Sequence, residues 1–388
     1  MKFNLKTLPL AISIAFVPVS GMADEMMDAK VAQLEQQVKA LQAHQTNSLV
    51  DRFNFNGFIS GAYISSNNRA SYNGATSSAD FSQDSKMGFQ GSFNINNQTQ
   101  AVLQLLMKGE DDWDVKAEWA YLSYRLDNGV KVRGGKLRVP LFMYSDYLDV
   151  GYAQPFARPP KEVYDHVIFT SYTGGDIAYD IEFDDSTLTL QAFGGESNVN
   201  EDSINVDFSN LIGGSAAWTD LTWTVRAVYG QADVDGAVFG GALPVEDEQA
   251  TFTGIGGSYD NGSFLAVTEW TKVKVDGLLA DHESGYLTLG YRIDVFTPYT
   301  TVAYMKTTDN DKRTSMPLNL ALNDKRTAYS AGVRWDAIDN VAIKFDLTYA
   351  TDFGDTSGGL SGNEYNPATG SFMLDDTFVY TVKFDAVF

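Results

Sequence analysis

The chain has 388 residues, a formal net charge of −22, 13% aromatic residues and no cysteine. The acidic balance excludes nucleic acid as a partner, because the phosphate backbone would repel the chain. Without cysteine an exported chain has no disulfide framework, so its stability must come from closure and packing. The 34 glycines, 20 tyrosines and 24 phenylalanines favour extended, turn-rich structure over helical bundles.

The first 23 residues have the pattern of an export signal. Lys2 and Lys6 make the start positive, Leu8 to Val19 is apolar, and Gly21-Met22-Ala23 offers small residues for cleavage. The apolar stretch is shorter than the roughly twenty residues that a membrane-spanning helix needs. We therefore predict a signal peptide over residues 1–23, with the mature chain beginning at Asp24.

Residues 24–50 follow a different period from the rest of the chain. Apolar side chains alternate in steps of four and three, which is the seam of a heptad repeat: Met27, Val31, Leu34, Val38 and Leu41. A lone helix of about three heptads is marginal, so partners would stabilise it, and we predict a periplasmic coiled coil in an oligomer. The alternative is one amphipathic helix that lies on the following domain or plugs it.

From Phe53 onward the period is two, as in a β-strand with two different faces. Between Val341 and Tyr349 every odd position is apolar, whereas Lys344, Asp346 and Thr348 occupy even positions. The polar face carries charge and the apolar face ends in aromatic residues. This pattern is typical of a lipid-facing band around an aqueous interior.

The same alternation predicts an all-β domain over residues 51–388, a transmembrane antiparallel β-barrel of about sixteen strands. The ends of the predicted strands are accurate to within about two to four residues. The predicted strands are 53–65, 85–95, 98–108, 116–126, 129–137, 175–184, 186–195, 209–219, 221–233, 250–260, 262–275, 283–293, 295–307, 325–336, 340–352 and 376–388.

The connections alternate between short and long. Turns after even-numbered strands hold one to a few residues such as Asn96-Asn97 and Asp127-Asn128, whereas 66–84, 138–174, 234–249, 308–324 and 353–375 are long. This is the layout of outer-membrane barrels, and an even count lets the first and last strands pair and remove the sheet edge.

Two segments resemble the Gram-negative porin family, in its gammaproteobacterial form. The terminal strand carries Phe378, Tyr380 and Phe384 and ends in Phe388, as members of that family do, and it is similar to the signal that the barrel-insertion machinery recognises. The long segment after the fifth strand, about 138–174, resembles a porin constriction loop in the runs 133–142, 144–152 and 158–164. The resemblance covers about 53–388.

The resemblance implies a passive diffusion channel in the cell outer membrane, as a homotrimer that contacts outer-membrane lipid and conducts ions and small hydrophilic solutes. In the family, basic wall residues face acidic loop residues at a charged neck, where the opposed charges create a transverse field. For each wall residue the alternative is a salt bridge away from the neck. By strand parity and loop position the candidate constriction residues are Lys131, Arg133, Asp146, Asp149, Glu162, Asp165, Arg226, Arg292, Arg334 and Lys344.

Other functions stay open at this point. Similar N-terminal extensions occur in phosphate- and sugar-selective porins, and Lys136 and Lys161 hint at anions, so a substrate-selective channel is the alternative. The heptad segment would also suit a cell-wall tether or adhesin. The loop residues Tyr144, Tyr147, Tyr152 and Phe156 either guide sugars or pack the loop against the wall.

The sequence offers little for enzyme chemistry, so we predict no enzyme activity and no cofactor. His44 lies in the heptad segment, and His166 and His282 lie in predicted loops, so no strand pairs a histidine with a nucleophile. No phosphate-binding glycine loop or metal-ligand spacing is present. Asp309-Asn310-Asp311 lacks the glycine and distal glutamate of a calcium loop.

Overall fold

The computed structural model describes residues 52–72, 74–201 and 203–388, and Phe53–Phe388 forms one compact unit. The predicted signal peptide and coiled coil lie outside the described residues. No helix in this part of the chain is long and apolar enough to cross a membrane.

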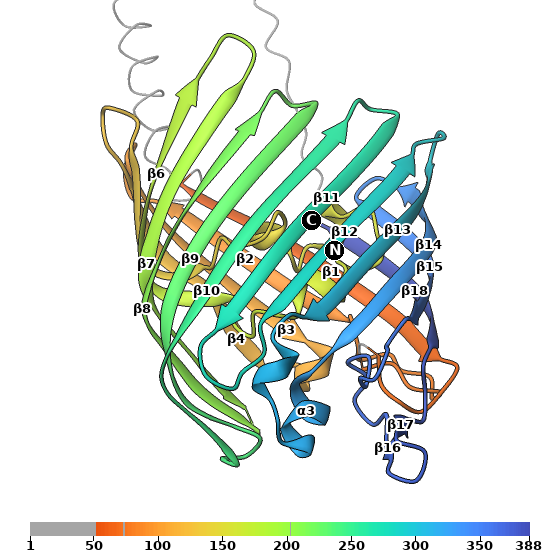
Figure 1. Cartoon of the computed structure of the whole chain (residues 1–388). Coiled ribbons are helices and arrows are strands. Elements are labelled where there is room, and N and C mark those ends of the chain that lie inside the picture. The colour runs from red at the N-terminus through yellow and green to blue at the C-terminus, as the bar shows by residue number, and fades with distance from the viewer. Residues whose placement is uncertain (1–51, 73, 202) are drawn as a thin grey trace, which may run out of the picture. The chain divides into compact units, whose positions relative to one another are not determined.

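Sixteen antiparallel strands of the described residues close into a barrel (Figure 1). In the sheet each strand pairs with its sequence neighbours, and β18 pairs with β1 and β15. The barrel strands are β1 (Phe53–Ser66), β2 (Lys86–Asn94), β3 (Thr99–Lys108), β4 (Val115–Arg125), β5 (Lys131–Arg138), β6 (Ser171–Glu182), β7 (Thr187–Glu201), β8 (Ile204–Thr219), β9 (Trp223–Val238), β10 (Leu243–Asp260), β11 (Phe264–Val275), β12 (His282–Tyr291), β13 (Phe296–Thr307), β14 (Lys325–Ile338), β15 (Val341–Thr351) and β18 (Thr377–Val387).

The remaining elements are short and lie in the long connections. They are η1 (Gly109–Asp111), η2 (Ser145–Tyr147), η3 (Gly151–Ala153), α2 (Lys161–Tyr164), η4 (Asn310–Lys312), α3 (Met316–Leu322) and the hairpin of β16 (Tyr365–Asn366) with β17 (Ser371–Phe372). Figure 1 shows tight hairpins at one rim and α3 with the β16–β17 hairpin at the other, as the long-short alternation predicts.

The first and last strands close the cylinder. In the register of β1 with β18, Gly61 is opposite Phe384. Beyond β18, the Gly57 amide donates to the Phe388 carbonyl at 2.8 Å and the Phe388 amide donates to Gly57 at 2.9 Å. Closure leaves no unpaired edge, which is the condition for a sheet to lie in lipid.

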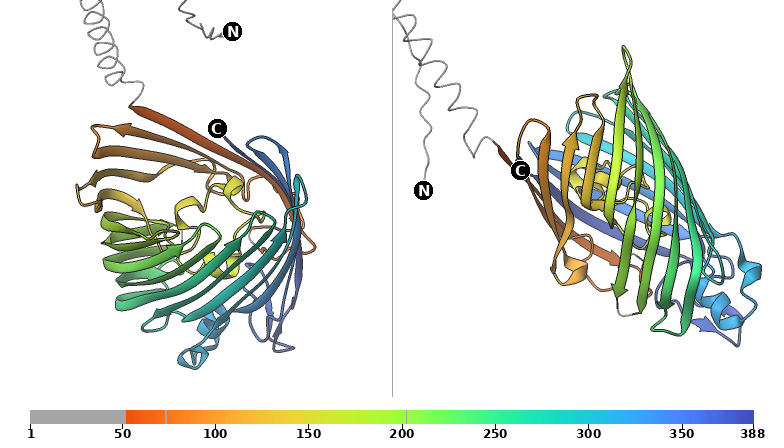
Figure 2. Two further views of the ribbon diagram at one scale, coloured as in Figure 1. Left: turned by 90° about the horizontal axis from the view of Figure 1, so that it is seen from above. Right: turned by 90° about the vertical axis from the view of Figure 1, so that its left-hand side faces the viewer.

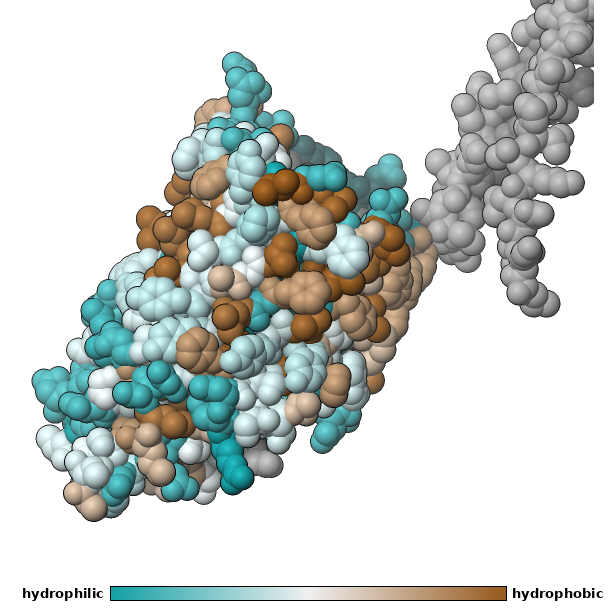
Figure 3. Space-filling model, turned by 90° about the vertical axis from the view of Figure 1, so that its right-hand side faces the viewer, coloured by the Kyte–Doolittle hydropathy of each residue, from teal (hydrophilic) through white to brown (hydrophobic). Residues whose placement is uncertain are grey.

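The barrel is apolar outside and polar inside. On β15, Phe345 and Leu347 are 45% and 42% exposed, whereas Lys344 between two outward-facing residues is fully buried. A soluble protein would show the opposite distribution. Apolar and aromatic side chains cover the strand region in Figure 3, and hydrophilic side chains gather toward the rim of long loops. The predicted period-two segregation is therefore confirmed.

Two predicted connections are wrong in extent. The interval 234–249 was expected to be a loop, but β9 continues to Val238 and β10 begins at Leu243. Similarly, β7 reaches Glu201 and β8 begins at Ile204, beyond the predicted strand ends. These extensions persist because their alternating apolar side chains bury one another and the side chains of α3: Val206, Val234, Val238, Leu243, Val245, Leu318 and Leu322.

Glycines let three neighbouring strands approach closely. Gly135, Gly174 and Gly195 are cross-strand neighbours on β5, β6 and β7. A Cβ on Gly174 would lie 2.1 Å from the Gly194 carbonyl oxygen, a backbone atom that cannot move without the strand. On the adjacent strand, a Cβ on Gly134 would meet nothing closer than 4.0 Å.

We expect Gly174→Ala to lower the free energy of unfolding by about 1–3 kcal/mol, the usual cost of overpacking. Gly134→Ala is the matched control and should stay within about 0.5 kcal/mol of the wild-type chain. The measurement is the melting temperature of the barrel. Samples are heated to increasing temperatures without boiling, and electrophoresis detects how much folded barrel is left. Equal melting of the two variants would show that the close approach does not limit stability.

Candidate functional site

The segment between β5 and β6, residues 139–170, lies inside the ring of strands (Figure 2). We call it the inner loop. It contains η2, η3 and α2. The predicted constriction loop, about 138–174, covers the same stretch, except that Arg138 ends β5 and Ser171 begins β6.

Aromatic side chains attach one side of the inner loop to the wall. Phe142 lies 5.2 Å from Phe252 of β10, ring centre to ring centre, and Tyr164 lies 6.3 Å from Tyr286 of β12. Tyr144 and Phe156 are buried in the same cluster. Both therefore pack the loop in this structure, whereas Tyr147 remains exposed and Tyr152 lies under the Arg334 guanidinium.

Cationic side chains of the wall hold backbone carbonyls of the inner loop. Each donor comes from a lumen-facing strand position, and each acceptor would otherwise lack a strand partner. The contacts are Arg226 of β9 to Leu141 at 3.1 Å and to Pro140, Arg334 of β14 to Tyr152 at 2.6 Å and Gln154 at 3.0 Å, Lys344 of β15 to Gly151 at 2.7 Å, and Lys383 of β18 to Ala157 at 3.0 Å.

Two loop carboxylates are held in buried ion pairs. Asp149 accepts from Lys86 of β2 at 2.9 Å and from Arg138 at 2.6 Å. Burial alone would raise the pKa of Asp149, but Lys86 and Arg138 hold that pKa well below its usual range. Asp149 consequently stays ionised in mildly acidic solution, and its attachment to β2 and β5 persists there.

Glu162, the other buried carboxylate, lies in α2. Arg326 of β14 donates to it at 2.6 Å and the Tyr72 hydroxyl at 2.9 Å. Three strands along the wall, Glu269 of β11 accepts from the Met143 amide at 2.9 Å and the Tyr164 hydroxyl at 2.8 Å, whereas Lys86, which holds Asp149, lies across the ring on β2. The inner loop is thus anchored to strands on both sides of the lumen.

A buried charge cluster supports η3. Lys344 lies 2.9 Å from Asp385, the Ser60 hydroxyl donates to Asp385 at 2.5 Å, and Lys383 is 3.7 Å away. All three charged side chains are at most 2% exposed. Gly151 packs directly over Asp385, where a Cβ would lie 2.0 Å from the carboxylate. The cluster therefore fixes both the loop backbone and the seam between β15 and β18.

A second group of charges is partly open to water. Arg133 of β5 pairs with Asp176 of β6 at 2.5 Å, keeps 18% of its side chain exposed and lies over the Tyr121 ring, whereas the Asp176 side chain is only 1% exposed. Asp146 of the inner loop is exposed. We call Lys131, Arg133, Asp146 and Asp176 the neck cluster.

The candidate constriction residues fall into distinct environments. Lys131, Arg133 and Asp146 are at least partly open to water, and Arg226 binds carbonyls of the inner loop. Asp149 and Glu162 form buried pairs, and Arg334 and Lys344 bind loop carbonyls, as given above. Arg292 follows β12 in the short-turn rim and pairs with Asp260 at 2.5 Å, and Asp165 pairs with Lys161 at 3.2 Å.

Sequence reasoning missed several anchors. Lys383 and Asp385 occupy lumen-facing positions in the alternating pattern of the last strand, so that pattern could have identified them. Arg326 and Lys86 lie at strand ends, where the alternation of inward and outward side chains is a weak guide. Arg138, Arg158 and Glu269 gave no local signal, because their partners are distant in sequence. Within the described residues, no group of three or more His, Cys, Asp or Glu is placed to hold a metal ion.

A closed sixteen-stranded barrel with a lipid-facing surface and a charged loop folded into its lumen defines an outer-membrane channel protein. The sequence matches the family described as Gram-negative porin over residues 11–357. The chain belongs to this family and resides in the outer membrane. A comparison with curated proteins found no match.

Solved porin structures share the fold. OmpT of Vibrio cholerae is 13% identical with a TM-score of 0.57, and the match covers 87% of this chain and 97% of that one. The channel DcaP of Acinetobacter baumannii is 11% identical with a TM-score of 0.56, covering 87% and 97%. OmpF of Salmonella typhi, in complex with daunomycin, is 14% identical with a TM-score of 0.53, covering 86% and 97%. At these identities the likeness concerns the fold alone.

Proposed function

We propose that the protein is a passive diffusion channel for ions and small hydrophilic solutes, with its selectivity set at the neck cluster, and that it performs no bond chemistry. The observation that carries this proposal is the inner loop folded into the ring of strands, with the exposed Asp146 on the loop and the partly exposed Arg133 on β5 (Figure 2). Opposed charges in a narrow aqueous passage favour polar solutes and bias ion permeation.

The test is planar-bilayer conductance of the purified protein in a salt gradient, where the reversal potential gives ion selectivity. Discrete conductance steps support the channel. A protein that inserts as a folded barrel but never conducts would contradict it. Adding inorganic phosphate or an oligosaccharide separates the two kinds of channel, since saturable block at low concentration would favour a substrate-selective pore.

We expect Arg133→Ala to raise the cation-over-anion permeability ratio by about two- to fivefold, the size of a partly exposed charge contribution. The substitution leaves Asp176 with the Gln191 amide, which donates at 2.9 Å, but without its cation. Arg292→Ala is the matched control, because it also removes the arginine of an Arg–Asp pair but lies at the rim. A reversal potential that shifts equally in both variants would show that the neck cluster does not set the ion selectivity.

The oligomer and its assembly belong to the same proposal. OmpT of Vibrio cholerae is described in a trimer form, and the heptads at 24–50 suit a homotrimer. Tyr380, Phe384 and Phe388 are at least 45% exposed on the outer face, where the barrel-insertion machinery and lipid can reach them. Deleting residues 24–50 tests the segment: conductance should survive, and trimer stability or cell-wall association should fall.

A further inference from the structure

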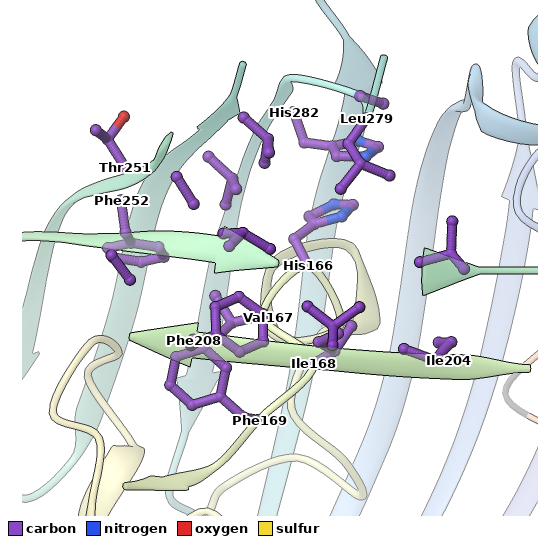
Figure 4. Close-up of a pocket in the computed structure, with 18 of the residues that line it drawn as sticks. His166, Val167, Ile168, Phe169, Ile204, Phe208, Thr251, Phe252, Leu279 and His282 are labelled. Atoms are coloured by element: carbon purple, nitrogen blue, oxygen red, sulfur yellow. The ribbon is translucent and has the colours of Figure 1, made fainter. Parts of the chain in front are cut away.

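The lumen contains an apolar cavity beside the inner loop. Its volume is about 370 Å³, and it lies between residues 166–169, the inner faces of β8 to β11, and α3 (Figure 4). Phe169 of the inner loop, Phe208 of β8, Phe252 of β10 and Leu322 of α3 contribute to its walls. The neck cluster carries charge, whereas this part of the lumen offers mostly hydrocarbon.

Two histidines form the polar end of the cavity. His166 of the inner loop and His282 of β12, both labelled in Figure 4, stack with ring centres 4.3 Å apart and planes 16° apart. His166 Nε2 and His282 Nδ1 are both buried, and neither has a hydrogen-bond partner. Buried polar atoms are nearly always paired in folded proteins, so two unpaired nitrogens at one cavity indicate groups that a ligand completes.

The protonation state of His166 follows from its surroundings. Burial lowers the pKa of His166 well below its usual range, and the nearby charges of His282 and Arg326 lower it further. In a neutral ring one of the two nitrogens carries a lone pair, so the unpaired Nε2 of His166, a residue that lines the cavity, can serve as an acceptor.

The charged groups near the cavity are already engaged. Asp324 accepts from the Ser357 hydroxyl at 3.1 Å and the Gly359 amide at 2.8 Å. Arg313, near His282, pairs with Asp309 at 2.5 Å and donates to Asn323 at 2.6 Å. An anionic ligand would therefore find hydrocarbon and no free cation among these groups, and burying its charge would be unfavourable.

We propose that this cavity is a binding site for an uncharged, mainly apolar small molecule with one hydrogen-bond donor, such as an alkylphenol, whose hydroxyl donates to His166 Nε2. The proposal rests on the channel function and adds a solute class to it. The apolar body fills the space between Phe208, Phe252 and Leu322, and the site lies beside the passage that the inner loop narrows.

The experiment uses the full-length protein in planar bilayers with 4-butylphenol and butylbenzene as probes. Ala232→Phe fills the cavity from β9, and Ala227→Phe places the same ring on the lipid face of that strand as a control. We expect 4-butylphenol to reduce single-channel conductance saturably in the wild-type and Ala227→Phe channels, and to lose at least tenfold in affinity with Ala232→Phe. Equal block of all three channels would overturn the proposal.

His166→Phe tests the acceptor separately, because it keeps an aromatic ring and removes the nitrogen. It should weaken 4-butylphenol about tenfold, leaving the weaker effect of butylbenzene unchanged. A loss that is the same for both probes would refute the hydrogen bond. Failure of the channel function would appear as absent conductance before any probe is added. Normal conductance without saturable block in wild type would overturn the cavity proposal alone.

Discussion

Exchange of Lys344 for methionine should lower the free energy of unfolding by about 3–5 kcal/mol, the cost of removing one partner from a buried ion pair. Asp385 would lose the ammonium 2.9 Å away and keep only the Ser60 hydroxyl and Lys383 at 3.7 Å. The Gly151 carbonyl would lose its donor as well. One measurement is the melting temperature of the folded barrel. The other is the noise of the single-channel current, which should increase as η3 is held less firmly.

The control is Lys325→Met, which removes a lysine that pairs with Asp352 at the same 2.9 Å but is 46% exposed. Exposed pairs contribute at most about 1 kcal/mol, so this variant should melt close to wild type. Combining Lys344→Met with Asp385→Asn should recover only part of the loss, because it removes the buried carboxylate that lost Lys344 but leaves the buried Lys383 with the Ala157 carbonyl and without Asp385. Similar melting of Lys344→Met and Lys325→Met would show that the buried cluster does not hold the seam.

Charge reversal at Arg326 should release one end of the inner loop. Arg326→Glu places two carboxylates where Arg326 now donates to Glu162 at 2.6 Å, and the repulsion would separate α2 from β14. We expect the open-channel current to fluctuate and its mean to rise by about twofold, because a freed loop narrows the passage less. The measurement is single-channel recording at fixed voltage.

The double variant Arg326→Glu with Glu162→Arg restores opposite charges in exchanged positions, so its current should be steady again. Lys306→Glu reverses a charge in the exposed pair with Glu283 and is the control. A steady, wild-type current from Arg326→Glu alone would mean that the loop is held without this pair.

The anchors explain how charge is divided in the lumen. Most basic wall residues are bound to the loop: Arg334 and Lys344 to carbonyls, and Arg326 to a carboxylate. Arg133 and Asp146 keep part of their side chains open to water. We therefore expect selectivity to depend on fewer charges than the lumen contains.

Strand alternation was predictable because lipid and water impose opposite demands on neighbouring residues. Phe345 and Lys344 illustrate this, since the lipid side favours the phenyl ring and the interior accommodates the ammonium group. The extension of β9 and β10 was not predicted, because Glu246, Asp247 and Glu248 indicate a loop, and the burial of Val238 against Leu243 depends on α3.

The site was predictable only in part. Parity predicted Arg133 on the lumen side and the loop assignment supplied Asp146, and both remain candidate constriction residues. Which carboxylate would be buried could not be anticipated, because Asp149 and Glu162 meet partners from β2 and β14 that only the folded loop brings near. The pairing of His166 with His282 likewise depends on how the loop returns to β6.

The central claim is that alternate side chains face lipid and an aqueous lumen, and consecutive single cysteines on β6 test it most directly. The chain has no cysteine, so Ile177→Cys, Ala178→Cys, Tyr179→Cys and Asp180→Cys each introduce one thiol into a silent background. In proteoliposomes, a small water-soluble thiol reagent should label positions 178 and 180, and only a lipid-soluble reagent should label 177 and 179. Equal labelling of all four by either reagent would contradict the account.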